Sequence, residues 1–131
     1  MKSKSNISDK NFTKVKSTMY YKYINDIIEK LKTINPEKII LFGSYANGNP
    51  TEYSDLDLIV VTGDNNYPKN YSEKIGIYLK VSNLLSDFKK NIPIDLIVYS
   101  KPMYEKFIDL GSLFSKEVAK NGKIVYERIN T

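Results

Sequence analysis

The sequence contains no cysteine and no histidine. Their absence excludes disulfides, zinc–thiolate sites, cysteine nucleophiles, histidine triads and histidine general bases. Any chemistry must therefore depend on Asp, Glu, Lys, Arg, Tyr or Ser side chains, or on a bound metal. Carboxylates without imidazole suit hard cations such as Mg²⁺ or Mn²⁺.

Long apolar runs are also absent. No segment approaches the roughly 20 consecutive apolar residues that a membrane-crossing helix needs, and residues 1–12 lack the apolar core of a secretory signal peptide. We therefore expect a cytoplasmic protein with no membrane partner. With 131 residues, of which 41% are hydrophobic and 27% charged, the chain has the size and composition of one globular domain with a single core.

The charge is basic, with a formal net value of +5, and a basic balance can indicate nucleic-acid binding. Most of this charge lies in residues 1–16, where five lysines and one aspartate leave a net charge of +4. The remaining chain is nearly neutral and offers no basic face. We interpret residues 1–16 as a disordered basic tail and residues 17–131 as the folded domain. An arm that binds nucleic acid is the less favoured alternative.

Hydrophobic spacing predicts an α+β (α/β) fold, with a small mixed sheet of about three to five strands flanked by helices. Apolar residues three and four positions apart predict a helix over 18–34, which ends before Pro36. A second helix is predicted over 71–90, with Ser72 as its N-cap. The other predicted elements are strands over 38–42, 56–62, 93–100 and 123–127, and helices over 102–109 and 113–120.

Aspartates stand at the beginnings of two predicted strands. Asp57 lies inside the apolar run LDLIVV, and Asp55 stands two positions before Asp57. Strand alternation therefore directs both side chains to one face. The strands over 56–62 and 93–100 are separated by a helix, which makes a β-α-β unit with parallel strands. Parallel strands begin at the same edge of a sheet, so Asp95 is expected beside Asp57.

Gly43 and Ser44 are expected at the same edge. The short link from Phe42 to Asp55 favours a first strand antiparallel to the second, and the end of the first strand then meets the aspartates. Glycine lets the backbone approach a ligand closely. The N–H groups of a following helical turn, together with the Ser44 hydroxyl, can bind terminal phosphates.

Each of these residues also has a plainer interpretation. Taken singly, Asp55 is typical of a turn, Asp95 of a sheet edge and Gly43-Ser44 of a strand end. Asp57 is harder to explain in this way because it lies within an apolar run. Three neighbouring carboxylates repel one another, so at least one would be protonated unless a cation bound them. We therefore predict that Asp55, Asp57 and Asp95 hold one or two Mg²⁺ ions, or Mn²⁺.

Gly43-Ser44, ten further residues and Asp55-x-Asp57 together resemble the signature of the nucleotidyltransferase superfamily that includes DNA polymerase β. The chain looks most similar to the minimal nucleotidyltransferases, the MNT group, which are related to the kanamycin nucleotidyltransferase domain. The resemblance covers roughly residues 20–128 and includes Asp95. One departure is Asn47, where many relatives carry an arginine.

The resemblance implies transfer of a nucleoside monophosphate from a triphosphate such as ATP to a hydroxyl group, with pyrophosphate as the leaving group. The catalytic residues would be Asp55, Asp57 and Asp95, which would also be the metal ligands. Asp95 would in addition accept the proton of the attacking hydroxyl. Gly43 and Ser44 would bind the β- and γ-phosphates of the nucleotide.

The resemblance also implies a partner, because minimal nucleotidyltransferases are commonly paired with HEPN toxins and some attach AMP to a toxin tyrosine. We therefore expect an AMP-transferring antitoxin whose HEPN partner completes the acceptor site. Two alternatives stay open. The chain could be a non-catalytic antitoxin that neutralises a toxin by docking, or an aminoglycoside-type small-molecule transferase, for which a homodimer would have to form the acceptor pocket.

Overall fold

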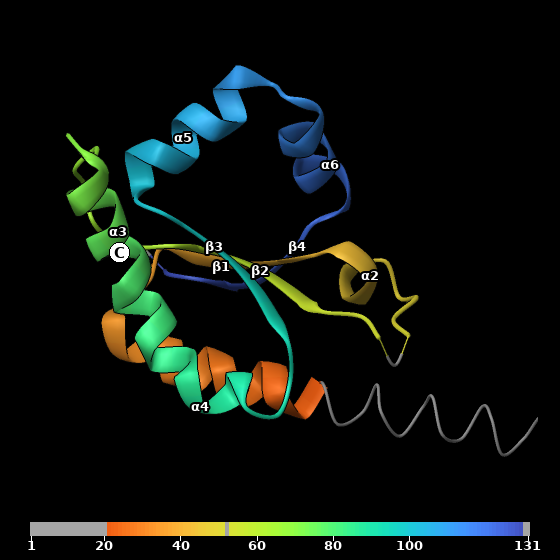
Figure 1. Ribbon diagram of the computed structural model, residues 1–131. Coiled ribbons are helices and arrows are strands. Elements are labelled where there is room, and N and C mark those ends of the chain that lie inside the picture. The colour runs from red at the N-terminus through yellow and green to blue at the C-terminus, as the bar shows by residue number, and fades with distance from the viewer. Residues whose placement is uncertain (1–20, 52, 130–131) are drawn as a thin grey trace, which may run out of the picture.

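A four-stranded mixed sheet organises the domain (Figure 1). The computed structural model describes residues 21–51 and 53–129, so the predicted tail of residues 1–16 lies outside the described residues. The strands are β1 (Lys38–Phe42), β2 (Leu56–Val61), β3 (Ile94–Tyr99) and β4 (Lys123–Glu127). Their order is β3-β2-β1-β4, with β2 parallel to β3 and β1 antiparallel to both β2 and β4. The predicted mixed sheet is confirmed.

Helices cover both faces of this sheet. Figure 1 shows α5 and α6 on one side of the sheet, and the helix of residues 21–31 together with α3 and α4 on the other. The helices on the first side are α5 (Lys101–Leu110) and α6 (Leu113–Asn121). On the other side, the helix of residues 21–31 continues into η1 (Lys32–Ile34), and the later segment comprises α3 (Tyr71–Ser82), η2 (Asn83–Leu85) and α4 (Ser86–Lys89).

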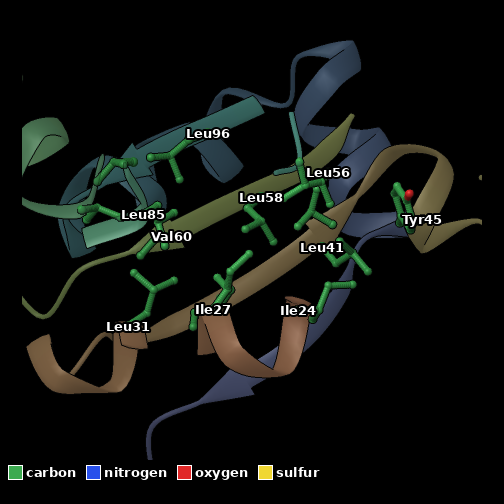
Figure 2. Packing of buried hydrophobic residues seen from close by; sticks show 14 of the residues in the cluster. Ile24, Ile27, Leu31, Leu41, Tyr45, Leu56, Leu58, Val60, Leu85 and Leu96 are labelled. Atoms are coloured by element: carbon green, nitrogen blue, oxygen red, sulfur yellow. The ribbon is translucent and has the colours of Figure 1, made fainter. Parts of the chain in front are cut away.

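The larger core lies between the sheet and this second group of helices. Leu56, Leu58 and Val60 of β2 point into it and are at most 1% exposed, which follows from the alternation of strand side chains. Ile27 and Leu31 pack against them from the first helix (Figure 2). Each aliphatic side chain buried in this way contributes about 1.5–3 kcal/mol to folding.

A smaller core lies on the opposite face, under α5 and α6. Ile40, Ile59, Val61 and Val118 are buried there. The partly buried residues around them are mostly aromatic: Phe42, Ile97, Tyr99, Tyr104 and Phe107. Asp57 belongs to this face because it alternates with Leu56 and Leu58, as the sequence predicted.

The segment predicted as one helix over 71–90 is interrupted. A 3₁₀ turn, η2, separates α3 from α4. Ser82, Asn83 and Ser86 lie at this point, and Ser86 Oγ donates to the Asn83 carbonyl at 3.0 Å; such local bonds compete with regular helix.

The predicted N-cap of α3 was also wrong. Asn70, not Ser72, caps the helix by accepting a hydrogen bond from the Glu73 N–H at 2.9 Å. Glu73 in turn accepts from the Lys69 N–H at 2.6 Å. This reciprocal arrangement satisfies two donors at the helix start, whereas Ser72 is exposed within the first turn.

Candidate active site

Gly43 begins the site directly after β1. Its φ of +71° lies in the left-handed region that favours glycine. A Cβ at this position would collide with the carboxylate of Asp57, coming within 3.0 Å of its Cγ. The Gly43 backbone and the Asp57 side chain are therefore in contact, and that contact is possible only because residue 43 has no side chain.

A single helical turn, α2 (Gly43–Ala46), follows. It is closed by hydrogen bonds from the Asn47 N–H to the Gly43 carbonyl at 3.1 Å and from the Asn49 N–H to the Ser44 carbonyl at 3.0 Å. Tyr45 is only 1% exposed and anchors the turn in the larger core. The first N–H groups of any helical turn have no partner within it, so the backbone at Gly43 and Ser44 is suited to binding an anion.

A row of three side chains crosses the sheet at this edge. Phe42 of β1 is the Cα partner of Asp57 in β2, and Asp57 is the Cα partner of Asp95 in β3. Residues directly opposite one another in a sheet project to the same face. Phe42, Asp57 and Asp95 therefore stand side by side on the face that α5 and α6 cover. We call the two aspartates, Asp57 and Asp95, the acidic row.

The two carboxylates of the acidic row interact unfavourably. Burial, the charges of Asp95 and Asp55, and a side-chain hydrogen bond with Asp95 raise the pKa of Asp57 from 3.8 to about 6. Asp57 is half-buried between the strands of the sheet, and burial is the largest of these causes. A site that concentrates negative charge in this way favours a cationic ligand.

Asp55 lies at the mouth of the site and is exposed. The turn before it is held by Thr51 and Ser54, since the Thr51 N–H donates to Ser54 Oγ at 2.8 Å. After it, the Leu56 N–H donates to the Pro93 carbonyl at 2.9 Å and ties this loop to the beginning of β3. Asp55 acts on Asp57 through its charge.

The structure thus brings Gly43, Asp57 and Asp95 together and places Asp55 beside them. Within residues 21–51 and 53–129, no three acidic side chains are already placed so that together they could hold a metal ion. The assignment of all three aspartates as ligands therefore stays a prediction. The donor set nevertheless fits a hard divalent cation, because it consists of carboxylate oxygens whose mutual repulsion a cation would relieve.

Aromatic residues next to the acidic row were not identified from the sequence. The ring centroid of Phe42 lies 5.4 Å from that of Phe114 on α6, in an edge-to-face arrangement. Phe107 on α5 lies 5.6 Å from Phe114. The position of Phe42 directly before Gly43 was the one signal in the sequence, whereas Phe114 is 71 residues away from Gly43.

Residues 23–131 match the family model described as polymerase beta, nucleotidyltransferase. The chain belongs to this family. The resemblance based on Gly43, Ser44 and the Asp55-x-Asp57 pair is therefore confirmed, and the domain is a nucleotidyltransferase of the polymerase β type.

Individual relatives agree with this membership. The nucleotidyltransferase is 39% identical to "Putative protein adenylyltransferase MJ1379" of Methanocaldococcus jannaschii, over 56% of this chain and 92% of that protein. A crystal structure of a putative nucleotidyltransferase from Sulfolobus solfataricus has the same fold, with a TM-score of 0.58 at 20% identity over 87% of this chain and 86% of that one.

A crystal structure of a toxin–antitoxin with AMP-PNP also shares the fold. Its TM-score is 0.51 at 24% identity, over 79% of this nucleotidyltransferase and 73% of that chain.

In the part of the chain that the structure describes, no helix has the length and apolar character needed to cross a membrane.

Proposed function

We propose that this nucleotidyltransferase moves AMP from ATP to a hydroxyl group of a partner protein. The observation that carries the proposal is the acidic row, in which Asp57 and Asp95 are paired in register beside the backbone of Gly43. The relative from M. jannaschii, whose name assigns it to the protein adenylyltransferases, supports both the adenylyl group and a protein acceptor.

Asp55, Asp57 and Asp95 would hold one or two Mg²⁺ ions, with Mn²⁺ as an alternative. A bound divalent cation supplies neutralisation of the charge on the phosphate oxygens. The pKa of Asp57 supports this assignment, because burial and the neighbouring carboxylates disfavour its ionised form. Binding a cation removes that penalty.

The remaining steps fall to the chain's own groups. Backbone N–H groups at Gly43 and Ser44, with the Ser44 hydroxyl, bind the β- and γ-phosphates and orient the α-phosphorus. The acceptor oxygen forms a bond to the α-phosphorus, the bond to the bridging oxygen breaks, and pyrophosphate leaves. Asp95, the exposed member of the acid pair, accepts the hydroxyl proton. No covalent enzyme intermediate is needed, which suits a chain without cysteine or histidine.

We propose a HEPN-type toxin as the acceptor, modified on a tyrosine, with this chain as its antitoxin. The resemblance to the minimal nucleotidyltransferases supports this partner, and so does the fold shared with a toxin–antitoxin structure that contains AMP-PNP. A partner chain that docks beside the exposed Asp95 would also supply part of the acceptor-binding site.

The test combines the purified chain, Mg²⁺, ATP labelled at the α-phosphate and the protein encoded next to it. We expect label on a tyrosine of that protein, and no transfer by the Asp57→Asn variant. A label that appears equally with Asp57→Asn would contradict the proposal. Replacing ATP by ATP labelled at the γ-phosphate is the control, because that label leaves with pyrophosphate.

Asn47 favours a second candidate, a non-catalytic module that neutralises its partner by docking. It ends the α2 turn and is exposed, so this position brings no positive charge to the proposed phosphate site. The two functions differ in one measurement. If the chain is a docking module, its Asp57→Asn variant still neutralises the toxin in growth assays. If it is an adenylyltransferase, that variant no longer does.

A further inference from the structure

Phe114 is held between two other rings and yet remains partly open to solvent. The Phe42 ring meets it at an interplanar angle of 71° and the Phe107 ring at 59°. Phe107 is in turn stacked on Tyr99, with centroids 5.1 Å apart. Despite these contacts, 38% of Phe114 is exposed. An aromatic ring fixed by its neighbours loses little further freedom when a ligand binds to it.

This ring lies next to the proposed phosphate site. Phe42 is the strand partner of Asp57 and directly precedes Gly43, and opposite residues of paired strands have Cβ atoms about 5 Å apart. Phe114 is one aromatic contact further along the same face. A nucleotide with its phosphates at Gly43 and Ser44 therefore has an apolar, aromatic surface beside it on the α6 side.

We propose that Phe114, supported by Phe42, forms the nucleobase subsite of this enzyme and takes the purine ring of a nucleoside triphosphate. The inference rests on the proposed function and adds the residue that binds the base. Nucleobases stack well on aromatic side chains because both have an extended π surface. Phe107 acts as a positioning residue, since it contacts Phe114 from within the smaller core.

The test compares a nucleotide with its phosphates alone. Calorimetry measures the affinity of the full chain, in Mg²⁺, for α,β-methylene-ATP, whose α–β bond is not cleaved, and for inorganic tripolyphosphate. Phe114→Leu keeps apolar packing against Phe42 and Phe107 but removes the ring. We expect this variant to bind the analogue about 5- to 100-fold more weakly and tripolyphosphate within about twofold of the wild type. Leu113→Ala, at a neighbouring apolar position that is 88% exposed, should bind both ligands normally.

A second measurement uses fluorescence, because the chain has no tryptophan of its own. In Phe114→Trp, a stacked purine should quench the indole emission, and tripolyphosphate should leave it unchanged. Equal affinity of wild type and Phe114→Leu for α,β-methylene-ATP would overturn the subsite and leave the proposed function intact. A wild type that binds neither ligand would overturn the proposed function itself.

Discussion

The two ends of the sheet differ in how their charged side chains are paired. At the end away from the acidic row, Arg128 Nη2 forms an ion pair with Glu37 Oε2 at 2.6 Å, and Arg128 Nη1 donates to the Asn35 carbonyl at 3.4 Å. At the other end Asp57 and Asp95 stand side by side, and among the described residues neither forms an ion pair with a lysine or arginine. One end thus pairs unlike charges, which favours folding, whereas the other sets like charges together at a cost that a bound ligand can offset.

The largest expected effect is on the rate of AMP transfer, which should depend on the acidic row and not on the opposite end of the sheet. Asp57→Asn keeps the size of the side chain but removes a charge from the acidic row, so we expect AMP transfer to fall by at least about 100- to 1,000-fold. Glu37→Gln, at the far end, is the matched control and should transfer AMP normally. The measurement is initial rate with labelled ATP. Equal losses in both variants would show that the acidic row has no special role.

A second prediction concerns the contact between Gly43 and Asp57. Gly43→Ala must adopt a left-handed φ and place a Cβ against the carboxylate, so we expect a loss of about 1–3 kcal/mol in the free energy of unfolding. Gly76→Ala is the control because nothing lies within 4 Å of a Cβ there. In the middle of α3 it should stabilise the protein by up to about 1 kcal/mol. Chemical denaturation of both variants measures the difference, and equal destabilisation would contradict it.

The pH dependence of stability sharpens the comparison. The pKa of Asp57 is raised to about 6 in the folded state, so between about pH 4 and pH 6 the folded protein binds more protons than the unfolded chain. Stability without metal should therefore fall as the pH rises through this window. We expect the free energy of unfolding to fall by only about 1 kcal/mol across this window, because solvent screens these partly exposed groups.

Asp57→Asn should remove this slope, and saturating Mg²⁺ should reduce it in the wild type because a cation favours the ionised form. Melting curves at several pH values, with EDTA and with Mg²⁺, measure both changes. A wild type whose stability rises through the same window without metal would contradict the electrostatic description of the acidic row.

The smallest expected effect is at the opposite end. The side chains of Glu37 and Arg128 are 14% and 27% exposed, so Glu37→Gln should lower the free energy of unfolding at neutral pH by about 1 kcal/mol. Glu29→Gln, which removes an exposed ion pair with Lys32, is the control and should change stability less. A larger effect at Glu29 than at Glu37 would contradict the assignment of the far end as the stabilising one.

Much of the arrangement of the candidate site could be predicted from local sequence, whereas its roles in metal and nucleotide binding stay predictions. Asp57 could be singled out as a candidate because burying an unpaired charge within the apolar run LDLIVV is unfavourable. Gly43 could be singled out because it directly follows a short apolar strand. The parallel pairing of β2 and β3, which makes Asp57 and Asp95 neighbours, followed from the helix between them. These inferences needed only strand alternation and the topology of a β-α-β unit.

Other features depend on contacts that local sequence does not specify. Asn70 and Ser72 are both good N-cap residues, and the choice depends on the carboxylate of Glu73 reaching the Lys69 N–H. The position of Phe114 depends on how α5 and α6 pack on the sheet, since its contact with Phe42 spans 72 residues of sequence. Long-range packing of this kind has no periodic signal.

Among the strands of the described residues, β3 is the outermost of the sheet, so within that part of the chain Asp95 has a neighbouring strand on one side only. The acidic row consequently stands at a corner of the domain. A rigid protein surface could approach from the flank and present one of its own side chains there, with no need to unfold or to thread a loop inward. For the proposed transfer of AMP to a protein, shape complementarity with the approaching surface, rather than the size of an enclosed cavity, would decide at such a corner which hydroxyl group is modified.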